Sequence, residues 1–313
     1  MGEVYLALHR TGCGVERLVA LKTISEPHCH HQPFVKLFLA EARITATLTH
    51  PHIVQVYDAG LLEGHHFLAM EFVDGPTLRQ VLRHPEVGKL PLPAVLTLGV
   101  QLCSALEYAH GKRDLLGTPL RIVHRDVSPD NVIVDGQGYA KLCDFGISKS
   151  TLAQLDEDAE SGTWKGKKGY MSPEQCEHRH IDCRSDVFSL GIVLWEMLTG
   201  TRLFAGDNLY AVMSMIREAE IPPPDSVSDC PAALSEIVIR ALRRDSDERY
   251  ARAADLERAL TRFVHETNLE LGTMPLGDIL RRHFPAMQRA HDEIAKAVLS
   301  AGPLTEVTVV EAS

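Results

Sequence analysis

Three short runs between positions 124 and 146 carry side chains that could do chemistry. They are His124-Arg125-Asp126, then Asn131 five positions after that Asp, then Asp144-Phe145-Gly146 thirteen positions after the Asn. Carboxylate and amide oxygens are hard ligands that suit Mg²⁺. Alone, each run is typical of a solvated surface turn. Together and in this order they indicate a site rather than three unrelated turns.

Two further runs complete a family pattern. Val19-Ala20-Leu21-Lys22 lies upstream and Met171-Ser172-Pro173-Glu174 lies downstream. With them the chain resembles the eukaryotic-type (Hanks-type) serine/threonine protein kinases, and Val127-Ser128-Pro129 gives it the character of their bacterial branch. The resemblance covers residues 1 to about 263. It implies an enzyme that uses ATP and Mg²⁺ to phosphorylate hydroxyl groups of a protein substrate.

The resemblance assigns a role to each matching residue. Asp126 would accept the hydrogen bond of the substrate hydroxyl and take its proton. Lys22 would hold the α- and β-phosphates, with its ammonium fixed by the carboxylate of Glu41. Asn131 and Asp144 would ligate Mg²⁺. Phosphoryl transfer needs positioning and charge stabilisation more than covalent chemistry, which is why these residue types occur together.

The resemblance also implies an ATP-binding pocket and a structural frame. The base would lie in an apolar pocket, with backbone hydrogen bonds from residues 71–73 and the phosphates covered by a glycine loop. In addition to Lys22 and Glu41, the residues implied are Gly2, Val4, Ala20, Met70, Glu71, Val73 and Ile133. Glu174 would pair with Arg249, and Asp186 would anchor the backbone of the catalytic loop.

The chain departs from the family pattern at its start. The pattern is G-x-G-x-x-G-x-V, whereas this sequence opens on Met1-Gly2-Glu3-Val4 and keeps the last glycine of the loop. A misplaced start or a truncated chain is the simplest explanation. The alternative function is therefore a pseudokinase-like module, catalytically impaired, that binds and scaffolds partners. The intact Lys22, Asp126, Asn131 and Asp144 argue against it, and a small-molecule phosphotransferase of the same fold is a weaker alternative.

A second departure concerns a lysine. The family has lysine two residues after the catalytic Asp, where this chain has Ser128, and a hydroxyl residue further on, where this chain has Lys167. We hypothesise that Lys167 is a catalytic residue and that it supplies the positive charge that is missing at Ser128. The competing interpretation is a solvated basic run over residues 165–168.

Regulation by phosphate is predicted from Arg125, which directly precedes Asp126. A phosphoryl group carries about −1.5 to −2 charges and pairs well with arginine. The candidate phosphosites are Thr163, which is preferred, and Ser161, and self-association for autophosphorylation would fit them. The alternative is that these hydroxyls only make the segment soluble.

Composition limits the remaining possibilities. The 313 residues carry a formal net charge of −10, which argues against a nucleic-acid partner. Seven cysteines without regular spacing indicate reduced thiols. The apolar run 187–198 is too short to cross a bilayer and no secretory signal is seen, so the predicted location is the cytoplasm. Cys176, His178, His180 and Cys183 have zinc-ligand types, but their spacing favours an ordinary surface loop.

Hydrophobic periodicity predicts an α+β protein of two lobes, in which a small β-rich part precedes a larger helical one. The predicted domains are an incomplete N-lobe over 1–73, a C-lobe over 74–263, and a helical tail over 264–313. The expected strands are 3–8, 17–24, 52–59 and 65–72; the expected helices are 34–49, 94–109, 187–198, 232–242, 253–263, 276–284 and 287–299.

Overall fold

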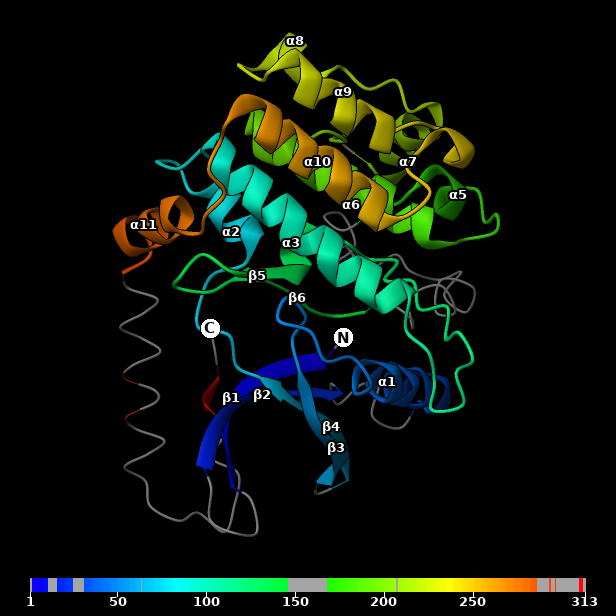
Figure 1. Cartoon of the computed structure of the whole chain (residues 1–313). Coiled ribbons are helices and arrows are strands. Elements are labelled where there is room, and N and C mark those ends of the chain that lie inside the picture. The colour runs from blue at the N-terminus through cyan, green and yellow to red at the C-terminus, as the bar shows by residue number, and fades with distance from the viewer. Residues whose placement is uncertain are drawn as a thin grey trace.

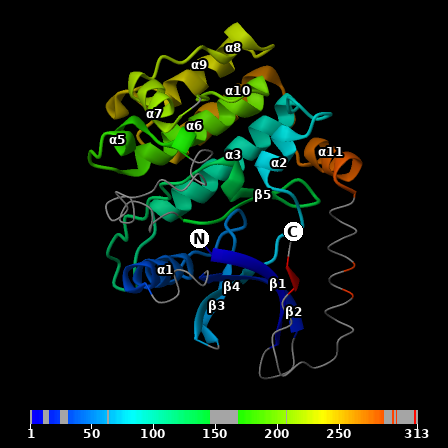
Figure 2. The same cartoon turned by 180° about the vertical axis from the view of Figure 1, so that it is seen from behind.

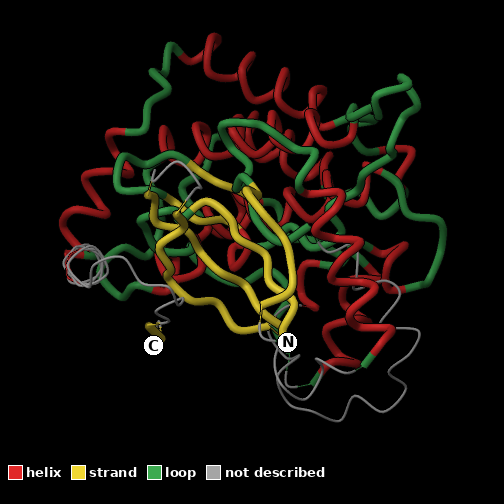
Figure 3. The backbone as a smooth tube through the Cα atoms, turned by 90° about the horizontal axis from the view of Figure 1, so that it is seen from below, coloured by secondary structure: helices red, strands yellow, loops and turns green. Residues whose placement is uncertain are grey.

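The computed structural model describes residues 2–10, 16–24, 31–62, 64–145, 168–206 and 208–285, together with residues 293, 296, 310 and 311. These residues form two lobes, a sheet with one helix and a larger helical body (Figure 1). The predicted α+β class is therefore confirmed. Figure 3 shows the strands (yellow) gathered in one part of the view from below and the helices (red) in the rest.

The small lobe is built on an antiparallel sheet in the order β3-β4-β2-β1-β7. Its strands are β1 (Gly2–Arg10), β2 (Glu16–Ile24), β3 (Val56–Leu62), β4 (His65–Glu71) and β7 (Val310–Glu311). In β2, Val19 and Leu21 are buried on one face, so the alternation of a strand turns Ala20 and Lys22 to the other. This second face is the one that can meet a ligand.

Helix α1 (Gln32–Thr45) packs on that second face. Its buried residues Val35, Phe38 and Ala42 follow helical spacing and join a cluster with Ile24, Val56 and Leu68. The helix ends at Thr45, four residues earlier than predicted. Beyond Thr45 the backbone forms tighter turns, in which Thr47 N–H donates to Ile44 O and Leu48 N–H donates to Thr45 O, each at 3.0 Å.

The predicted strand 52–59 is wrong in its first half, because β3 begins at Val56. Residues 52–54 instead lie against the helical lobe. Val54 N–H donates to Leu142 O and Leu142 N–H donates to His52 O, each at 2.9 Å. This segment therefore joins the two lobes.

The helical lobe surrounds α6 (Cys183–Thr199), which is buried along nearly its whole length. Helices α3 (Leu92–His110), α9 (Ala232–Ala241) and α10 (Ala253–Thr267) pack against it. Its other helices are α2 (Leu78–Arg83), α5 (Pro173–Cys176), α7 (Leu209–Glu218), α8 (Pro224–Val227) and α11 (Met274–His283). Two short strands, β5 (Val132–Val134) and β6 (Ala140–Leu142), form a hairpin at the junction of the lobes (Figure 1).

Among the described residues, α3 is the helix whose length and hydropathy match a membrane span. However, 67% of its most apolar window is buried in the protein, where it packs on α6 and α10. The core of the lobe therefore accounts for its composition.

The start of the predicted tail lies on the helical lobe. The boundary at 263 falls inside α10, which continues to Thr267. In α11, Leu276 and Leu280 are buried in the main hydrophobic core. Figures 1 and 2 show α11 beside α2. The second predicted tail helix, 287–299, lies outside the described residues except at 293 and 296.

Candidate active site

The β5–β6 hairpin brings two of the predicted site residues together. Val132 pairs with Leu142, so Asn131 and Asp144 flank the same end of the hairpin. Cys143 N–H donates to Asn131 O at 2.9 Å, which fixes the two segments to each other. Asp144 has a φ of 55°, a left-handed conformation that aspartate adopts more readily than most residues.

Asp126 and Asn131 form a buried pair on the loop before β5. The Asn131 Nδ2 amide donates to Asp126 Oδ2 at 2.6 Å and to Asp126 O at 2.7 Å. Both amide hydrogens are thereby directed at Asp126, which leaves Asn131 Oδ1 as the oxygen available to a cation. The donor set of Asn131 Oδ1 and the Asp144 carboxylate consists of hard oxygens and fits Mg²⁺.

Asp186, the fully buried carboxylate near the start of α6, holds the backbone of this loop. It accepts from His124 N–H at 2.7 Å, from Arg125 N–H at 2.8 Å and from His110 Nε2 at 2.7 Å. Burial favours the neutral acid, but the donors, led by His110, outweigh it and lower the pKa of Asp186. Arg125 has a φ of 65°, and its hydrogen bond to Asp186 holds this unfavourable conformation in place.

His124 connects the loop to the segment around Asp144. Its ring is fully buried beside Phe145, with 4.5 Å between ring centroids. Nε2 lies 3.1 Å from Cys143 O and donates to it, while Nδ1 accepts from Asp126 N–H at 3.2 Å. One donor and one acceptor correspond to the neutral imidazole.

Lys22 links the small lobe to this site. Its Nζ lies 2.6 Å from Asp144 Oδ1 and 3.3 Å from Glu41 Oε1 on α1. Burial opposes the ammonium charge, but Asp144 and then Glu41 outweigh it and raise the pKa of Lys22. Lysine, helix carboxylate and Asp144 thus form one contact across the two lobes.

The sheet register places other predicted pocket residues on the face of Lys22. Val4 pairs with Lys22, and Ala20 pairs with Met70. Partners directly across an antiparallel pair share a face, as do residues two apart. Val4 is 48% exposed and therefore open to a ligand.

The segment after β4 is placed where a ligand could meet its backbone. Glu71 N–H already donates to Gln55 O at 2.7 Å, so Glu71 can offer a ligand its carbonyl but not this N–H. Its side chain binds Lys141 Nζ at 2.6 Å. Val73 is buried, and Ile133 is half-buried and bridges to Thr77.

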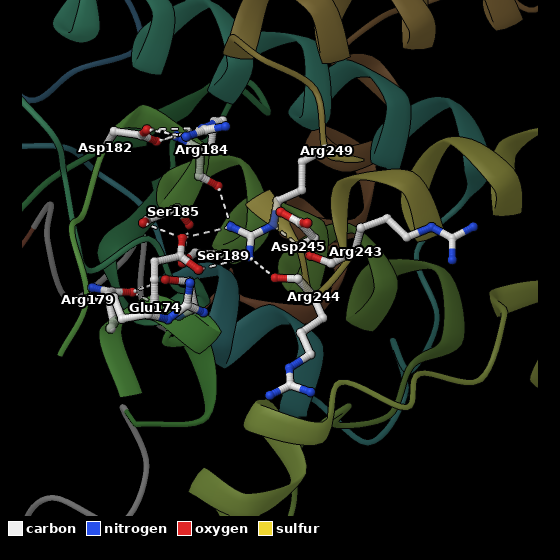
Figure 4. Close-up of polar contacts among 12 residues, drawn as sticks. Glu174, Arg179, Asp182, Arg184, Ser185, Ser189, Arg243, Arg244, Asp245 and Arg249 are labelled. Atoms are coloured by element: carbon white, nitrogen blue, oxygen red, sulfur yellow. Dashed lines mark hydrogen bonds and ion pairs between the residues drawn. The ribbon is translucent and has the colours of Figure 1, made fainter. Parts of the chain in front are cut away.

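Glu174 and Arg249 form the expected pair in the interior of the helical lobe (Figure 4). Two parallel bonds of 2.8 Å join the guanidinium to the carboxylate. The remaining Arg249 N–H groups donate to Arg243 O, Arg184 O and Arg244 O. All five guanidinium donors are therefore used.

Besides the Glu174–Arg249 pair, the helical lobe contains a buried network of polar side chains that the sequence did not predict. Arg79 of α2 donates to Asp130 at 3.2 Å and to the hydroxyl of Tyr170, which donates to Glu196 of α6 at 2.5 Å. Burial first, and then the charge of Glu196, raise the pKa of Tyr170. The available signal was Glu196 itself, a carboxylate within the mostly apolar run 187–198.

The other predicted site residues either lie outside the described part of the chain or do not come together in a site. Lys167, Thr163 and Ser161 lie outside the described residues. Gly2 begins β1 and pairs with Ile24. Of the possible zinc ligands, Cys176 is buried whereas His178 and His180 are exposed, and they do not form one of the ligand groups found among the described residues.

Comparison with known proteins extends these observations. The sequence-family model of the protein kinase domain matches residues 1–260. Two curated relatives are the tyrosine-protein kinase MasK of Myxococcus xanthus, 37% identical over 91% of this chain, and the serine/threonine-protein kinase PknB of Mycobacterium tuberculosis, 35% identical over 85%. The chain covers 44% and 41% of their respective lengths, so it spans less than half of either protein.

A solved structure shows the same fold. The crystal structure of the kinase domain of Mycobacterium tuberculosis PknI aligns with a TM-score of 0.62 at 26% identity. The alignment covers 84% of this chain and 91% of that one.

Proposed function

Since this chain belongs to the protein kinase family, we propose that it transfers the γ-phosphate of ATP, with Mg²⁺, to serine or threonine hydroxyls of a protein substrate. The observation that carries the proposal is the convergence of Lys22, Glu41 and Asp144 beside the Asp126–Asn131 pair. A pseudokinase-like scaffold would not need all of these groups in contact.

Each group has a task that its surroundings support. The raised pKa of Lys22 keeps its ammonium charged, so it can hold the α- and β-phosphates of ATP. Asp126 is oriented by Asn131 and accepts the proton of the substrate hydroxyl. Asn131 Oδ1 and Asp144 would hold Mg²⁺, which neutralises phosphate charge when bound.

ATP would bind on the sheet face shared by Val4, Ala20 and Met70. This face is apolar, while the carbonyl of Glu71 and the backbone of Val73 supply the polar edge that a base needs. Ile133 would close the pocket from the helical lobe, and Gly2 would lie at its phosphate end. All the residues named for the proposed nucleotide site thus precede position 146.

Serine/threonine specificity is supported by the name of PknB, whereas the name of MasK points to tyrosine. Substrate choice depends on the segment that precedes Glu174. In that segment we propose that Lys167 contributes charge at the catalytic Asp and that Thr163 or Ser161 accepts an activating phosphate, which Arg125 would pair. Phosphoryl transfer from one copy of the chain to another would supply this activating phosphate. The predicted site of action remains the cytoplasm.

The test is phosphoryl transfer from radiolabelled ATP with Mg²⁺, followed by identification of the labelled amino acid. Wild type should label serine or threonine, in itself or in a generic protein substrate. Asp126→Asn should reduce the rate by about 100-fold or more. Asp278→Asn, the same change at an exposed position on α11, should leave the rate unaltered.

Two outcomes would contradict the proposal. Nucleotide binding without transfer in a folded wild type would indicate the scaffold function instead. Label confined to tyrosine would retain the kinase and exclude the stated specificity.

A further inference from the structure

Two histidines and a glutamate from distant parts of the chain meet on the helical lobe. His84 directly follows α2, Glu86 lies two residues further on, and His283 ends α11. We call these three residues the α2–α11 cluster. Figure 2 shows the two helices side by side. Helix α2 also contacts β5 of the hairpin that carries the proposed active site, but the cluster shares no residue with that site.

The cluster has the geometry of a ligand set. One donor atom from each residue lies within 4.8 Å of the other two, and His283 Nδ1 is 3.1 Å from Glu86 Oε2. Zinc bonds to nitrogen and oxygen are about 2.0–2.2 Å long, which places tetrahedral ligand atoms roughly 3.3 Å apart. Small side-chain rotations are therefore enough to bring the three donors around one ion.

We propose that the α2–α11 cluster binds a divalent transition-metal ion of the zinc type, with water completing the coordination. Two imidazoles and one carboxylate are ligands that zinc prefers, and they select against Mg²⁺, which requires oxygen ligands. The metal of the proposed reaction and the metal of this cluster thus differ in chemistry as well as in place.

A histidine–glutamate ion pair by itself would explain less. Glu86 has a side-chain exposure of 74%, and an ion pair this open to water contributes about 0–1 kcal/mol. The ion pair does not include His84, whose ring centroid lies 5.1 Å from those of His283 and Phe284. Its Nδ1 accepts from Glu86 N–H at 3.4 Å, which leaves Nε2 for a metal ion. Metal binding uses all three side chains.

The site would hold the end of α11 on the lobe. Leu276 and Leu280 already pack the first two turns into the core, whereas the last turn carries the exposed residues Arg281 and Arg282. An ion shared by His84, Glu86 and His283 would fix this last turn.

The first experiment is calorimetric titration of metal-free protein with Zn²⁺. His84→Ala and His283→Ala should each weaken binding at one site by about tenfold or more. The double variant His178→Ala/His180→Ala, which removes two exposed histidines elsewhere, should keep that site. Zinc binding that is equal in wild type and in both single variants would show that the proposal is wrong.

Two further measurements keep the result interpretable. Co²⁺ bound at this site should give a visible spectrum without the intense sulfur charge-transfer band of cysteine ligation, and that band would place the ion elsewhere. Zn²⁺ should slow trypsin cleavage after Arg281 and Arg282 in wild type but not in His283→Gln, a milder variant. Equal protection in both would overturn the proposal.

Discussion

Tyr170 donates a hydrogen bond of 2.5 Å to Glu196 inside the helical lobe, and both side chains are buried. The contact joins the segment before Glu174 to the central helix α6. Arg79 binds the same hydroxyl and also Asp130, which is adjacent to Asn131. The segment before Glu174 and the catalytic loop are therefore joined by one network of polar side chains.

Tyr170→Phe should destabilise the protein by about 1–3 kcal/mol, because it leaves Glu196 buried without this donor. It should also lower kcat, because Arg79, which binds Asp130 beside Asn131, loses its hydrogen bond to the Tyr170 hydroxyl. Chemical denaturation and steady-state kinetics measure the two effects. Tyr139→Phe, at a tyrosine that is 42% exposed, is the matched control and should change neither.

Breaking the Glu174–Arg249 pair from one side should be costly. Glu174→Ala or Arg249→Ala should each lower the unfolding free energy by about 3–5 kcal/mol, since each leaves a buried charge unpaired. The double variant should cost less than the sum of the two. Additive losses in a denaturation cycle would show that the two residues act independently.

The Glu174 carboxylate should make the stability of the folded protein depend on pH. Burial favours the neutral acid, but Arg249 and then Ser185 outweigh it, so the pKa of Glu174 is lowered in the folded state. A lowered folded pKa gives stability that is complete above the unfolded value, about 4.3, and that is lost as the pH falls through the folded value. Melting temperatures below about pH 4.3 should therefore fall more steeply for wild type than for Glu174→Gln. Glu266→Gln, an exposed control, should follow wild type.

Asp186→Asn should lower both kcat and stability. His124 N–H and Arg125 N–H bond to different oxygens of Asp186, so the amide keeps an acceptor for one of them and turns an N–H₂ group toward the other, which loses its acceptor. The catalytic loop should then relax from the conformation with Arg125 at a φ of 65°. Kinetics and thermal unfolding test this, with the exposed Asp229→Asn as the control.

The proposed exchange of lysines makes a prediction of its own. Lys167→Thr should reduce kcat by about 100-fold, while Lys165→Thr, two positions earlier, should have little effect. Ser128→Lys should restore activity in the Lys167→Thr background. Ser128 is fully buried, so the restoring lysine must extend from a confined position toward Asp126. An unchanged kcat in Lys167→Thr would exclude the exchange.

Much of the fold could be predicted because its determinants are local. The strand alternation of β2, the apolar length of α6 and the periodicity of α9 are properties of neighbouring residues. The predicted bounds of β2 and α9 are within one residue of those observed, whereas α6 begins four residues before its predicted start. The start of β3 could not be predicted, since residues 52–54 bond across the chain to β6 rather than along the sheet. The end of α1 was also missed, because the apolar spacing that predicts the helix continues to Leu48, past the last residue of the helix.

The sequence by itself determined which residues are available for chemistry, because the spacings of Asp126, Asn131 and Asp144 are fixed along one short stretch of backbone. Only the tertiary structure decided which of them meet distant partners. Lys22 reaches Asp144 across the two lobes, and Asp186 reaches back to the catalytic loop from α6. His283 lies beside Glu86 because α11 packs two leucines into the core. Such contacts depend on how buried surfaces fit together, which no local spacing encodes.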